Sequence, residues 1–399
     1  MKEGWTYKKL GEVCESLNGL WKGKKPPYMN VGVIRNANFT KDFTLNFDNI
    51  EYLDVEEKQY SKRKLQAGDI IVEKSGGSDK QPVGRAVLFD KSEGEYSFSN
   101  FTSVLRIKDQ NEIYSAFLYK YLLYVYLGGA TKKMQKATTG IHNLEFQQYL
   151  NIDVPCIEMG VQQRIVERLD SAFENIDKLK ANAEKQLAEA RILFQKSLAK
   201  AMEPKEGWEE KKLGDVAEVN RGRSKHRPRN DKRLFGGPYP FIQTGDIRNA
   251  QGGEIKDFSQ TYSEFGLSQS KLWAKGTICI TIAANIGETA ILGFDACFPD
   301  SIVGIHPDET VLDALFLNYY LLSIKKEIDS QSYGTAQKNI NLEVLNNIVM
   351  QIPPLPVQQR IVERLDSLSE NVRKYEKIQR QIISECDALK QALLRKVFE

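Results

Sequence analysis

The sequence VQQRIVERLDS at Val161–Ser171 occurs a second time, unchanged, at Val357–Ser367. Shorter matching segments precede each occurrence in the same order along the chain. They are Glu3-Gly4-Trp5 with Glu206-Gly207-Trp208, Lys8-Lys9-Leu10-Gly11 with Lys211-Lys212-Leu213-Gly214, and Ile34-Arg35-Asn36-Ala37 with Ile247-Arg248-Asn249-Ala250. Because several matches in one order rarely arise by chance, the sequence predicts two copies of a unit of about 200 residues.

Each repeated segment opens a long amphipathic pattern. Apolar residues recur from Ile165 to Ala201, and again from Ile361 to Val397, with the mean spacing of about 3.6 residues that marks one face of an α-helix. Neither run contains Pro or Gly, so we expect two uninterrupted helices of about 41 residues each. A narrow apolar stripe needs a partner. The short connection Met202–Glu206 favours antiparallel pairing of the two helices with each other.

The segments before each helix have the composition of α/β globular domains. Short apolar runs bounded by Gly, Asn and Ser predict strands, and longer apolar runs predict helices. The predicted strands include Asp69–Val72, Ala86–Phe89, Thr277–Ile282 and Ser301–Ile305, and the predicted helices are Ala116–Leu127 and Val311–Lys326. The expected fold is α+β: two α/β globular domains joined by two long helices that pair as an antiparallel coiled coil, with a pseudo-two-fold internal repeat. The expected boundaries are 1–157 and 203–354 for the globular domains, and 158–202 and 355–399 for the helical regions.

Composition excludes several classes of protein. The five cysteines form no CxxC pair, and three histidines among 399 residues do not suggest a metal site. The chain starts without the apolar stretch of a secretory signal, and no apolar run has the length of a membrane helix. We therefore expect a cytoplasmic protein that binds no metal or cofactor itself. The net charge of +3 means that a polyanionic partner would have to meet local basic patches.

The sequence contains no complete catalytic motif. Lys25-Pro26-Pro27-Tyr28 looks like the Asp/Asn-Pro-Pro-Tyr motif of amino-methyltransferases. That chemistry requires the first side chain to accept a hydrogen bond from the target amine, which an ammonium group cannot do. No GxxxxGK[ST] loop for nucleotide phosphates is present.

Basic clusters recur at equivalent places in the two copies. The segment Arg221–Arg233 (RGRSKHRPRNDKR) corresponds to the lysines that follow Gly19 in the first copy. A solvated charge run is the alternative for either cluster alone, but recurrence favours nucleic acid, because phosphates are bound by Lys and Arg, while Arg and Asn also recognise base edges. The predicted DNA-binding residues are Lys22, Lys24, Lys25, Arg35, Asn36, Lys132, Lys133, Arg221, Arg223, Lys225, Arg227, Arg229, Arg233, Arg248, Asn249 and Lys338. For the two Arg-Asn pairs a turn shared for folding reasons, and for Lys132 and Lys133 the capping of a helix end, remain alternatives.

The order of these parts resembles the DNA-specificity subunit of type I restriction–modification systems, the HsdS family. The resemblance is carried by the KKLGEV and KKLGDV segments, by Phe298-Pro-Asp-Ser301, by Asn341-Leu342, and by Ile352-Pro-Pro-Leu-Pro-Val-Gln-Gln-Arg360-Ile, and it covers essentially the whole chain. The first copy departs from it, with Pro155-Cys-Ile-Glu-Met-Gly in place of the Pro-Pro-Leu-Pro run.

The resemblance implies a non-catalytic protein with two target-recognition domains, each of which reads one half of a bipartite double-stranded DNA site. It also implies helices that set the spacing of these domains and dock two methyltransferase subunits. S-adenosylmethionine, ATP and Mg would then be bound only by partner subunits, which could include restriction subunits. The repeated polar residues Gln162, Arg164, Glu167, Gln358, Arg360 and Glu363 lie off the apolar stripe and are the predicted docking residues. The alternative is that these residues only cap and solubilise the helices.

Two rival functions belong to other classes. A coiled-coil adaptor with protein-binding heads would bind proteins in a salt-insensitive way and would not bind DNA. A self-contained methyltransferase would bind the methyl donor without any partner.

Overall fold

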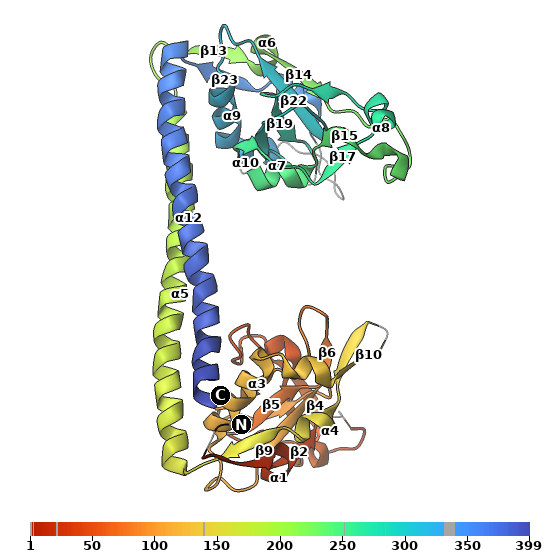
Figure 1. Cartoon of the computed structure of the whole chain (residues 1–399), viewed down its shortest axis with the longest axis vertical. Helices are drawn as coiled ribbons and strands as arrows, with labels where there is room; N and C mark the ends of the chain where they lie inside the picture. Colours follow the sequence, from red (N-terminus) through yellow and green to blue (C-terminus); the bar gives the residue numbers. More distant parts are fainter. Residues whose placement is uncertain are drawn as a thin grey trace. The chain divides into compact units, whose positions relative to one another are not determined.

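The computed structural model describes residues 2, 4–20, 23–138, 140–250, 252–283, 285–330 and 340–399. The chain forms two compact units, Met1–Glu184 with Arg380–Glu399 (unit 1) and Lys185–Gln379 (unit 2). Each unit contains a globular head and a part of each of two long helices (Figure 1). Head one precedes the first long helix, and head two lies between the two helices in sequence. Within the described part of the chain, no helix combines the length and apolar character that crossing a membrane requires.

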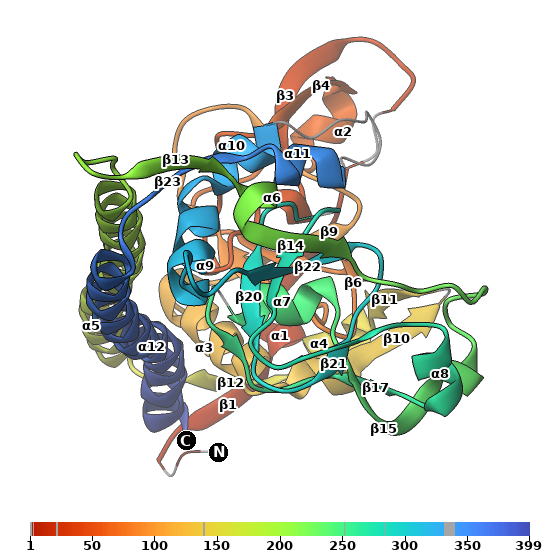
Figure 2. The same ribbon diagram turned by 90° about the horizontal axis from the view of Figure 1, so that it is seen from above.

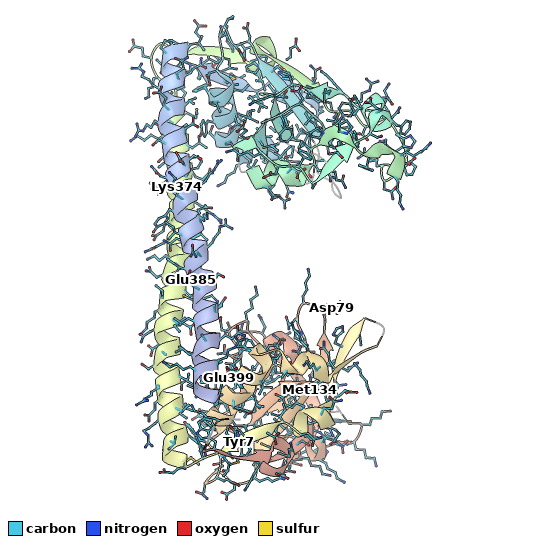
Figure 3. All side chains as sticks on the ribbon, viewed as in Figure 1. Tyr7, Asp79, Met134, Lys374, Glu385 and Glu399 are labelled. Atoms are coloured by element: carbon cyan, nitrogen blue, oxygen red, sulfur yellow. The ribbon has the colours of Figure 1, made fainter. Side chains whose placement is uncertain are left out.

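The two long helices are α5 (Met159–Ala201) and α12 (Leu355–Phe398). In unit 1, Lys180 Nζ lies 2.8 Å from Asp387 Oδ1, and Lys390 pairs with Asp177. In unit 2, Arg191 Nε lies 2.9 Å from Glu376 Oε1. Residue numbers rise along α5 as they fall along α12, so the helices pair antiparallel within each unit, and this prediction is confirmed. Figure 3 labels Lys374 and Glu385, which lie on α12 on either side of the division between the units.

Head one contains mixed sheets and short helices. Its strands are β1 (Thr6–Lys9), β2 (Cys14–Asn18), β3 (Tyr28–Ile34), β4 (Glu51–Glu56), β5 (Ile70–Glu73), β6 (Ser75–Gly77), β7 (Ala86–Leu88), β8 (Tyr96–Phe98), β9 (Thr102–Ile107), β10 (Gln135–Thr138), β11 (Ile141–Leu144) and β12 (Asp153–Cys156). Its helices are α1 (Leu10–Val13), η1 (Asn36–Asn38), α2 (Glu57–Ser61), α3 (Ser115–Leu127), η2 (Ala130–Met134) and α4 (Phe146–Leu150). The main sheet has the antiparallel order β2-β9-β5-β7.

Head two follows the same plan. Its strands are β13 (Glu209–Lys212), β14 (Ala217–Arg221), β15 (Phe235–Phe241), β16 (Glu254–Ile255), β17 (Gln260–Tyr262), β18 (Leu272–Trp273), β19 (Ile278–Thr281), β20 (Thr289–Leu292), β21 (Ala296–Cys297), β22 (Ile302–Pro307) and β23 (Val349–Ile352). Its helices are α6 (Leu213–Val216), η3 (Lys232–Leu234), α7 (Thr244–Ala250), α8 (Glu264–Ser268), α9 (Ala314–Ser323), α10 (Lys325–Ser330) and α11 (Leu342–Asn346). The main sheet has the order β14-β22-β19-β20-β16.

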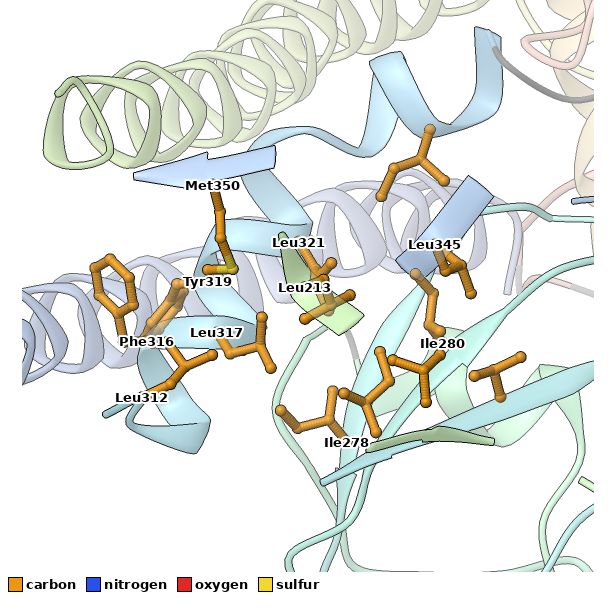
Figure 4. Close-up of a cluster of buried hydrophobic side chains, with 14 of the residues drawn as sticks. Leu213, Ile278, Ile280, Leu312, Phe316, Leu317, Tyr319, Leu321, Leu345 and Met350 are labelled. Atoms are coloured by element: carbon orange, nitrogen blue, oxygen red, sulfur yellow. The ribbon is translucent and has the colours of Figure 1, made fainter. Parts of the chain in front are cut away.

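The core of unit 2 joins the sheet to the long helices through α9, which lies between them in Figure 2. The sequence of α9, ALFLNYYLLS, is apolar on nearly every face, as expected for a helix buried on two sides. One buried cluster contains Ile278 and Ile280 of the sheet, Phe316 and Leu317 of α9, and Leu365 of α12. Figure 4 shows the sheet and α9 parts of this cluster. The head and the helices of the unit therefore share one hydrophobic core.

Equivalent backbone hydrogen bonds confirm the internal repeat. Leu10 N donates to Ile152 O at 2.9 Å in head one, and Leu213 N donates to Ile348 O at 2.9 Å in head two. The strand pair β1–β12 of head one has its counterpart in β13–β23 of head two. The KKLG segments are thus repeated because they place the first strand against the last strand of each head.

One predicted helix is divided in the structure. The apolar run Val311–Lys326 forms two helices, α9 and α10, separated at Ile324. Ile324 has φ −97° and ψ 12°, and its amide donates to Tyr320 O. A break of one residue does not interrupt the apolar pattern, so periodicity could not locate it.

Candidate nucleic-acid interface

The basic loop of head two, Arg221–Arg233, is anchored at its start to the main sheet. Gly222 N donates to Ile302 O at 2.8 Å, and Arg223 N donates to Phe298 O at 3.1 Å. A Cβ atom on Gly222 would lie 2.3 Å from Pro299 O, so only glycine fits at this position. The close approach fixes where the loop leaves the sheet.

The cations of this loop fall into two groups. Arg229 Nη2 donates to both carboxylate oxygens of Asp300 at 2.9 Å, and Arg233 donates to Asp231. Hydrogen bonds from Arg233, together with one from His226, hold the pKa of Asp231 well below its usual range. Arg227 donates to the backbone oxygens of residues 224 and 226. The side chains of these three arginines therefore make hydrogen bonds within the protein.

The remaining cations of the loop are exposed. Arg221, Arg223 and Lys225 form no ion pair with any described residue. The Lys225 amide donates to Gln269 O at 3.0 Å, which holds its backbone while its side chain stays in solvent. These three side chains, together with the exposed Lys232, which also forms no ion pair with a described residue, are the ones in the loop that are available to phosphates.

The equivalent loop of head one starts in the same way. A Cβ atom on Gly19 would lie 1.9 Å from Ser99 O, and Leu20 N donates to Phe98 O at 2.8 Å. Lys22 lies outside the described residues. Lys24 and Lys25 are exposed, but both backbone amides point to Glu56 Oε2, at 3.3 and 3.4 Å. This carboxylate makes the loop of head one less positive than that of head two.

Arg35 and Asn36 line a pocket of about 390 Å³ in head one. Arg35 pairs with Glu51, and Asn36 Nδ2 donates to Ser75 O at 2.6 Å. Arg35 Nε and Asn36 Oδ1 are buried and have no hydrogen-bond partner among the described residues. The rest of the wall is largely apolar and includes Phe101, of which 49% is exposed. The Arg35 side chain, which is 42% exposed, offers its guanidinium to a base edge, and the wall offers an apolar surface to a thymine methyl group.

Arg248, the counterpart of Arg35, has different surroundings in head two. Arg248 lines a groove of about 1040 Å³ between head two and the helices within unit 2. Other cations of the groove come from separate stretches of the chain: Arg191 and Lys196 of α5, Lys325 and Lys326 of α10, and Arg373 of α12. Arg191 is paired with Glu376, and Lys325 with Glu288. Arg248, Lys196 and Lys326 form no ion pair within the described ranges.

This groove was missed from the sequence. Its residues are far apart along the chain, and no local pattern brings them together. The Arg-Asn pair supplied the only signal. Asn249, its second member, is exposed on α7 beside Arg248.

The other predicted lysines have varied positions. Lys132 and Lys133 are exposed on η2 of head one. Lys338 lies outside the described residues. Among the predicted residues of head one, the pocket brings Arg35 and Asn36 together.

The predicted docking residues also fall into two classes. Gln162 and Gln358 are fully buried, and the expectation that they are exposed is wrong. Gln162 Oε1 accepts from Tyr114 N at 2.9 Å, and its Nε2 donates to Glu112 O at 2.8 Å and to Ile157 O at 2.7 Å. Each glutamine satisfies backbone groups of its own head, so neither presents its side chain to a partner.

Gln358 repeats these contacts in unit 2. Its Oε1 accepts from Asp313 N at 2.8 Å, and its Nε2 donates to Val311 O and to Pro353 O at 2.8 Å. The remaining predicted docking residues are all exposed on the first turns of the long helices; they are Arg164, Glu167, Arg360 and Glu363.

No group of three His, Cys, Asp or Glu side chains lies close enough to hold a metal ion within the described ranges. The five cysteines, all described, are free thiols.

Comparison with known proteins identifies the family. The description "Type I restriction modification DNA specificity domain" matches residues 2–189 and again residues 205–383. A putative type I restriction enzyme MjaX specificity subunit from Methanocaldococcus jannaschii is 23% identical over 395 residues, covering 95% of this chain and 90% of the relative. The StySPI specificity subunit from Salmonella potsdam is 23% identical over 438 residues, covering 100% of this chain and 89% of the relative.

Solved structures show the same fold. A chain from a study of complex assembly and conformational transition of the type I R-M system has a TM-score of 0.79 at 18% identity, covering 100% of this chain and 98% of the other. The HsdS subunit from Thermoanaerobacter tengcongensis has a TM-score of 0.57 at 20% identity, covering 100% and 97%. With two matched segments that include both heads and most of both helices, this chain belongs to the family of type I restriction modification DNA specificity domains.

Proposed function

We propose that this chain is the DNA-specificity subunit of a type I restriction–modification complex and that each head reads one half of a bipartite double-stranded DNA site. The observation that carries the proposal is the contrast between the heads. Both share one framework, but Arg35 lines an apolar pocket and Arg248 a cationic groove. Equivalent positions with different surroundings are suited to reading different sequences.

In head two, Arg221, Arg223 and Lys225 would contact phosphates, together with the groove cations Lys196, Arg248 and Lys326. In head one, the pocket of Arg35 and Asn36 would contact base edges, and Lys24, Lys25, Lys132 and Lys133 would contact phosphates. Phosphate contacts position a protein on DNA, and base contacts give it specificity.

The long helices would dock two methyltransferase subunits. The exposed residues Arg164 and Glu167 recur as Arg360 and Glu363, so the same surface is offered twice. Large apolar side chains are exposed along the helices, at Leu179 and Leu389 in unit 1 and at Leu193 and Ile378 in unit 2. Apolar surface of this kind is typical of protein–protein contacts.

The chemistry of the complex would lie in other subunits. We expect this chain to be non-catalytic, with S-adenosylmethionine on the methyltransferase subunits and ATP and Mg on restriction subunits where these are present.

The test is methylome sequencing of cells that express this chain with its methyltransferase partner. We expect one methylated motif with two fixed halves and an unread spacer. Titration of the purified chain with a duplex of that motif should give binding that weakens steeply with salt. Salt-insensitive binding to proteins without DNA binding would instead indicate an adaptor, and methyl-donor binding by the isolated chain would indicate a methyltransferase.

A further inference from the structure

The identical starts of α5 and α12 create an ambiguity of assembly. Both helices carry the same eleven residues near their start and continue with an apolar stripe of the same period. The shared stripe by itself would therefore allow α5 of one chain to pair with α5 of a second chain, or α12 with α12. Features outside the stripe have to distinguish the partners, and charges can do so, as in coiled coils.

Ion pairs link the helices at three places along their length. Lys180 and Asp177 of α5 pair with Asp387 and Lys390 of α12, and Arg191 of α5 pairs with Glu376 of α12. From one pair to the next, the residue number on α5 rises by as much as the residue number on α12 falls. All three pairs therefore follow the same antiparallel register. Lys180 Nζ also lies 3.6 Å from Asp42 Oδ1 of head one.

The repeat relates these pairs to one another with their charges exchanged. Val161 corresponds to Val357, an offset of 196 residues. The same offset relates Lys180 to Glu376 and Arg191 to Asp387. In unit 1 the cation of this pair, Lys180, is on α5 and the anion, Asp387, is on α12. The equivalent pair in unit 2, Arg191 with Glu376, also has its cation on α5 and its anion on α12.

Pairing of like helices in this register would bring like charges together. In an α5–α5 pair, Lys180 would face Arg191 at two symmetry-related places. In an α12–α12 pair, Glu376 would face Asp387, and Arg373 would face Lys390. All three attractive pairs would be lost in both arrangements.

One member of each pair is shielded from solvent, which strengthens the repulsion it would feel in a like pair. The side chains of Glu376, Lys390 and Lys180 are 12%, 17% and 21% exposed, whereas those of Arg191, Asp177 and Asp387 are 52%, 49% and 62% exposed. A charge held at a packed helix seam is screened by salt less than one on an open surface.

We infer that the charge pattern of the long helices specifies unlike pairing, so that α5 accepts α12, from its own chain or from a second copy, and rejects a second α5, while α12 rejects a second α12. An α5–α5 pair would give an assembled protein with two copies of head one. The pattern thus ensures that each assembled protein contains one head of each kind.

The experiment starts from the folded full-length chain. A protease site placed in the exposed segment Glu203–Glu206 is cut after folding, which leaves an N-terminal fragment with α5 and a C-terminal fragment with α12. Isotope-labelled and unlabelled nicked proteins are mixed in mild urea until the label is fully exchanged, and the urea is removed. Native mass spectrometry then counts each type of pair.

The wild-type fragments should reassemble only as unlike pairs. Arg191→Glu should reverse the preference, because α5–α5 gains two attractions between Lys180 and the introduced carboxylate, while α5–α12 gains a repulsion from Glu376. We expect the ratio of like to unlike pairs for the N-terminal fragment to rise at least about tenfold, which corresponds to about 1.4 kcal/mol. Adding Glu376→Arg should make α5–α12 favourable again while α5–α5 stays favourable, and so give a mixture of pairs for the N-terminal fragment; α12–α12 would keep the repulsion between Arg373 and Lys390.

Lys185→Glu is the matched control. It makes the same change of charge on α5, but Lys185 is 73% exposed and paired only with Glu189 of its own helix, so unlike pairing should persist. A statistical mixture from the wild type, or no increase in like pairs with Arg191→Glu, would overturn the inference. Neither result depends on DNA binding, so the inference and the proposed function can fail separately.

Discussion

At the scale of single residues, Gln162 and Gln358 show how identity between two copies can mislead. A polar residue off the apolar stripe of a helix is expected in solvent. Here the head folds over the start of the helix and buries the amide, which then joins three backbone groups from two segments. Both copies keep the glutamine because a side-chain amide both accepts and donates.

Replacing Gln358 tests this structural role. Gln358→Leu keeps the size of the side chain but leaves the Asp313 amide and two carbonyl oxygens without partners. Since an unsatisfied buried polar group costs about 1–3 kcal/mol, we expect unit 2 to lose about 3 kcal/mol of its free energy of unfolding, measured by urea denaturation. Gln359→Leu, at the exposed neighbouring position, should change it by less than about 0.5 kcal/mol. Equal effects of the two substitutions would contradict the assignment.

The basic loop of head two gives a second prediction at this scale. Neutralising three exposed cations with Arg221→Gln, Arg223→Gln and Lys225→Gln should reduce the salt dependence of DNA binding by roughly 0.9 per lost phosphate contact, or about 2 to 3 in total. Neutralising in the same way the three arginines that donate hydrogen bonds within the protein, Arg227, Arg229 and Arg233, should reduce it by less than about 1. Fluorescence anisotropy at several salt concentrations measures both slopes. The division of the loop is wrong if the two triple variants have the same slope.

At the scale of elements, the last turn of α12 is part of head one. The Phe398 ring lies 5.6 Å from that of Phe117 and 5.2 Å from that of Tyr121, and it also contacts Trp5 and Tyr124. Tyr124 Oη lies 3.3 Å from Glu399 Oε1, at the chain end labelled in Figure 3. The end of the second repeat thus completes the core of the first.

Removing this ring should destabilise unit 1. A buried Phe→Ala change costs about 3–5 kcal/mol, so we expect Phe398→Ala to lower the free energy of unfolding of unit 1 by about 3 kcal/mol or more and to leave unit 2 unchanged. Lys396→Ala, exposed on the same turn, serves as the control. Hydrogen exchange, which reports each unit separately, is the appropriate measurement, and equal protection of head one in both variants would argue against this docking.

The elements also show what could be predicted. Periodicity determines helices, and α5 and α12 agree with the predicted helical regions. The apolar stripe is only partly covered by a partner, because its members Leu179, Ile378 and Leu389 are about half exposed. The strand expected at Asp69–Val72 was found as β5, one residue later, because the Asp69 amide donates to Gln66 O at 3.0 Å and so closes a turn.

The surfaces were less predictable than the elements. Within the basic loop, Arg229 is paired because of Asp300, which is distant in sequence. The groove of Arg248 likewise depends on residues of α5 and α12. Contacts between distant segments leave no periodic signal, so local patterns could identify the residue types but not their partners.

At the scale of the whole molecule, the two heads have separate cores and should read DNA independently. Arg35→Ala with Asn36→Ala in head one should relax the preference at one half-site, at about 1–3 kcal/mol per affected base pair. Arg248→Ala with Asn249→Ala in head two should affect affinity or preference at the other half-site only. Because the changed residues belong to different compact units, the effects on binding free energy should add within about 0.5 kcal/mol when the variants are combined. Selection from a duplex library randomised at both half-sites measures the preferences, with Lys62→Gln, exposed on head one, as the control. Altered preference at both half-sites from a change in one head would show that the heads do not act as separate readers.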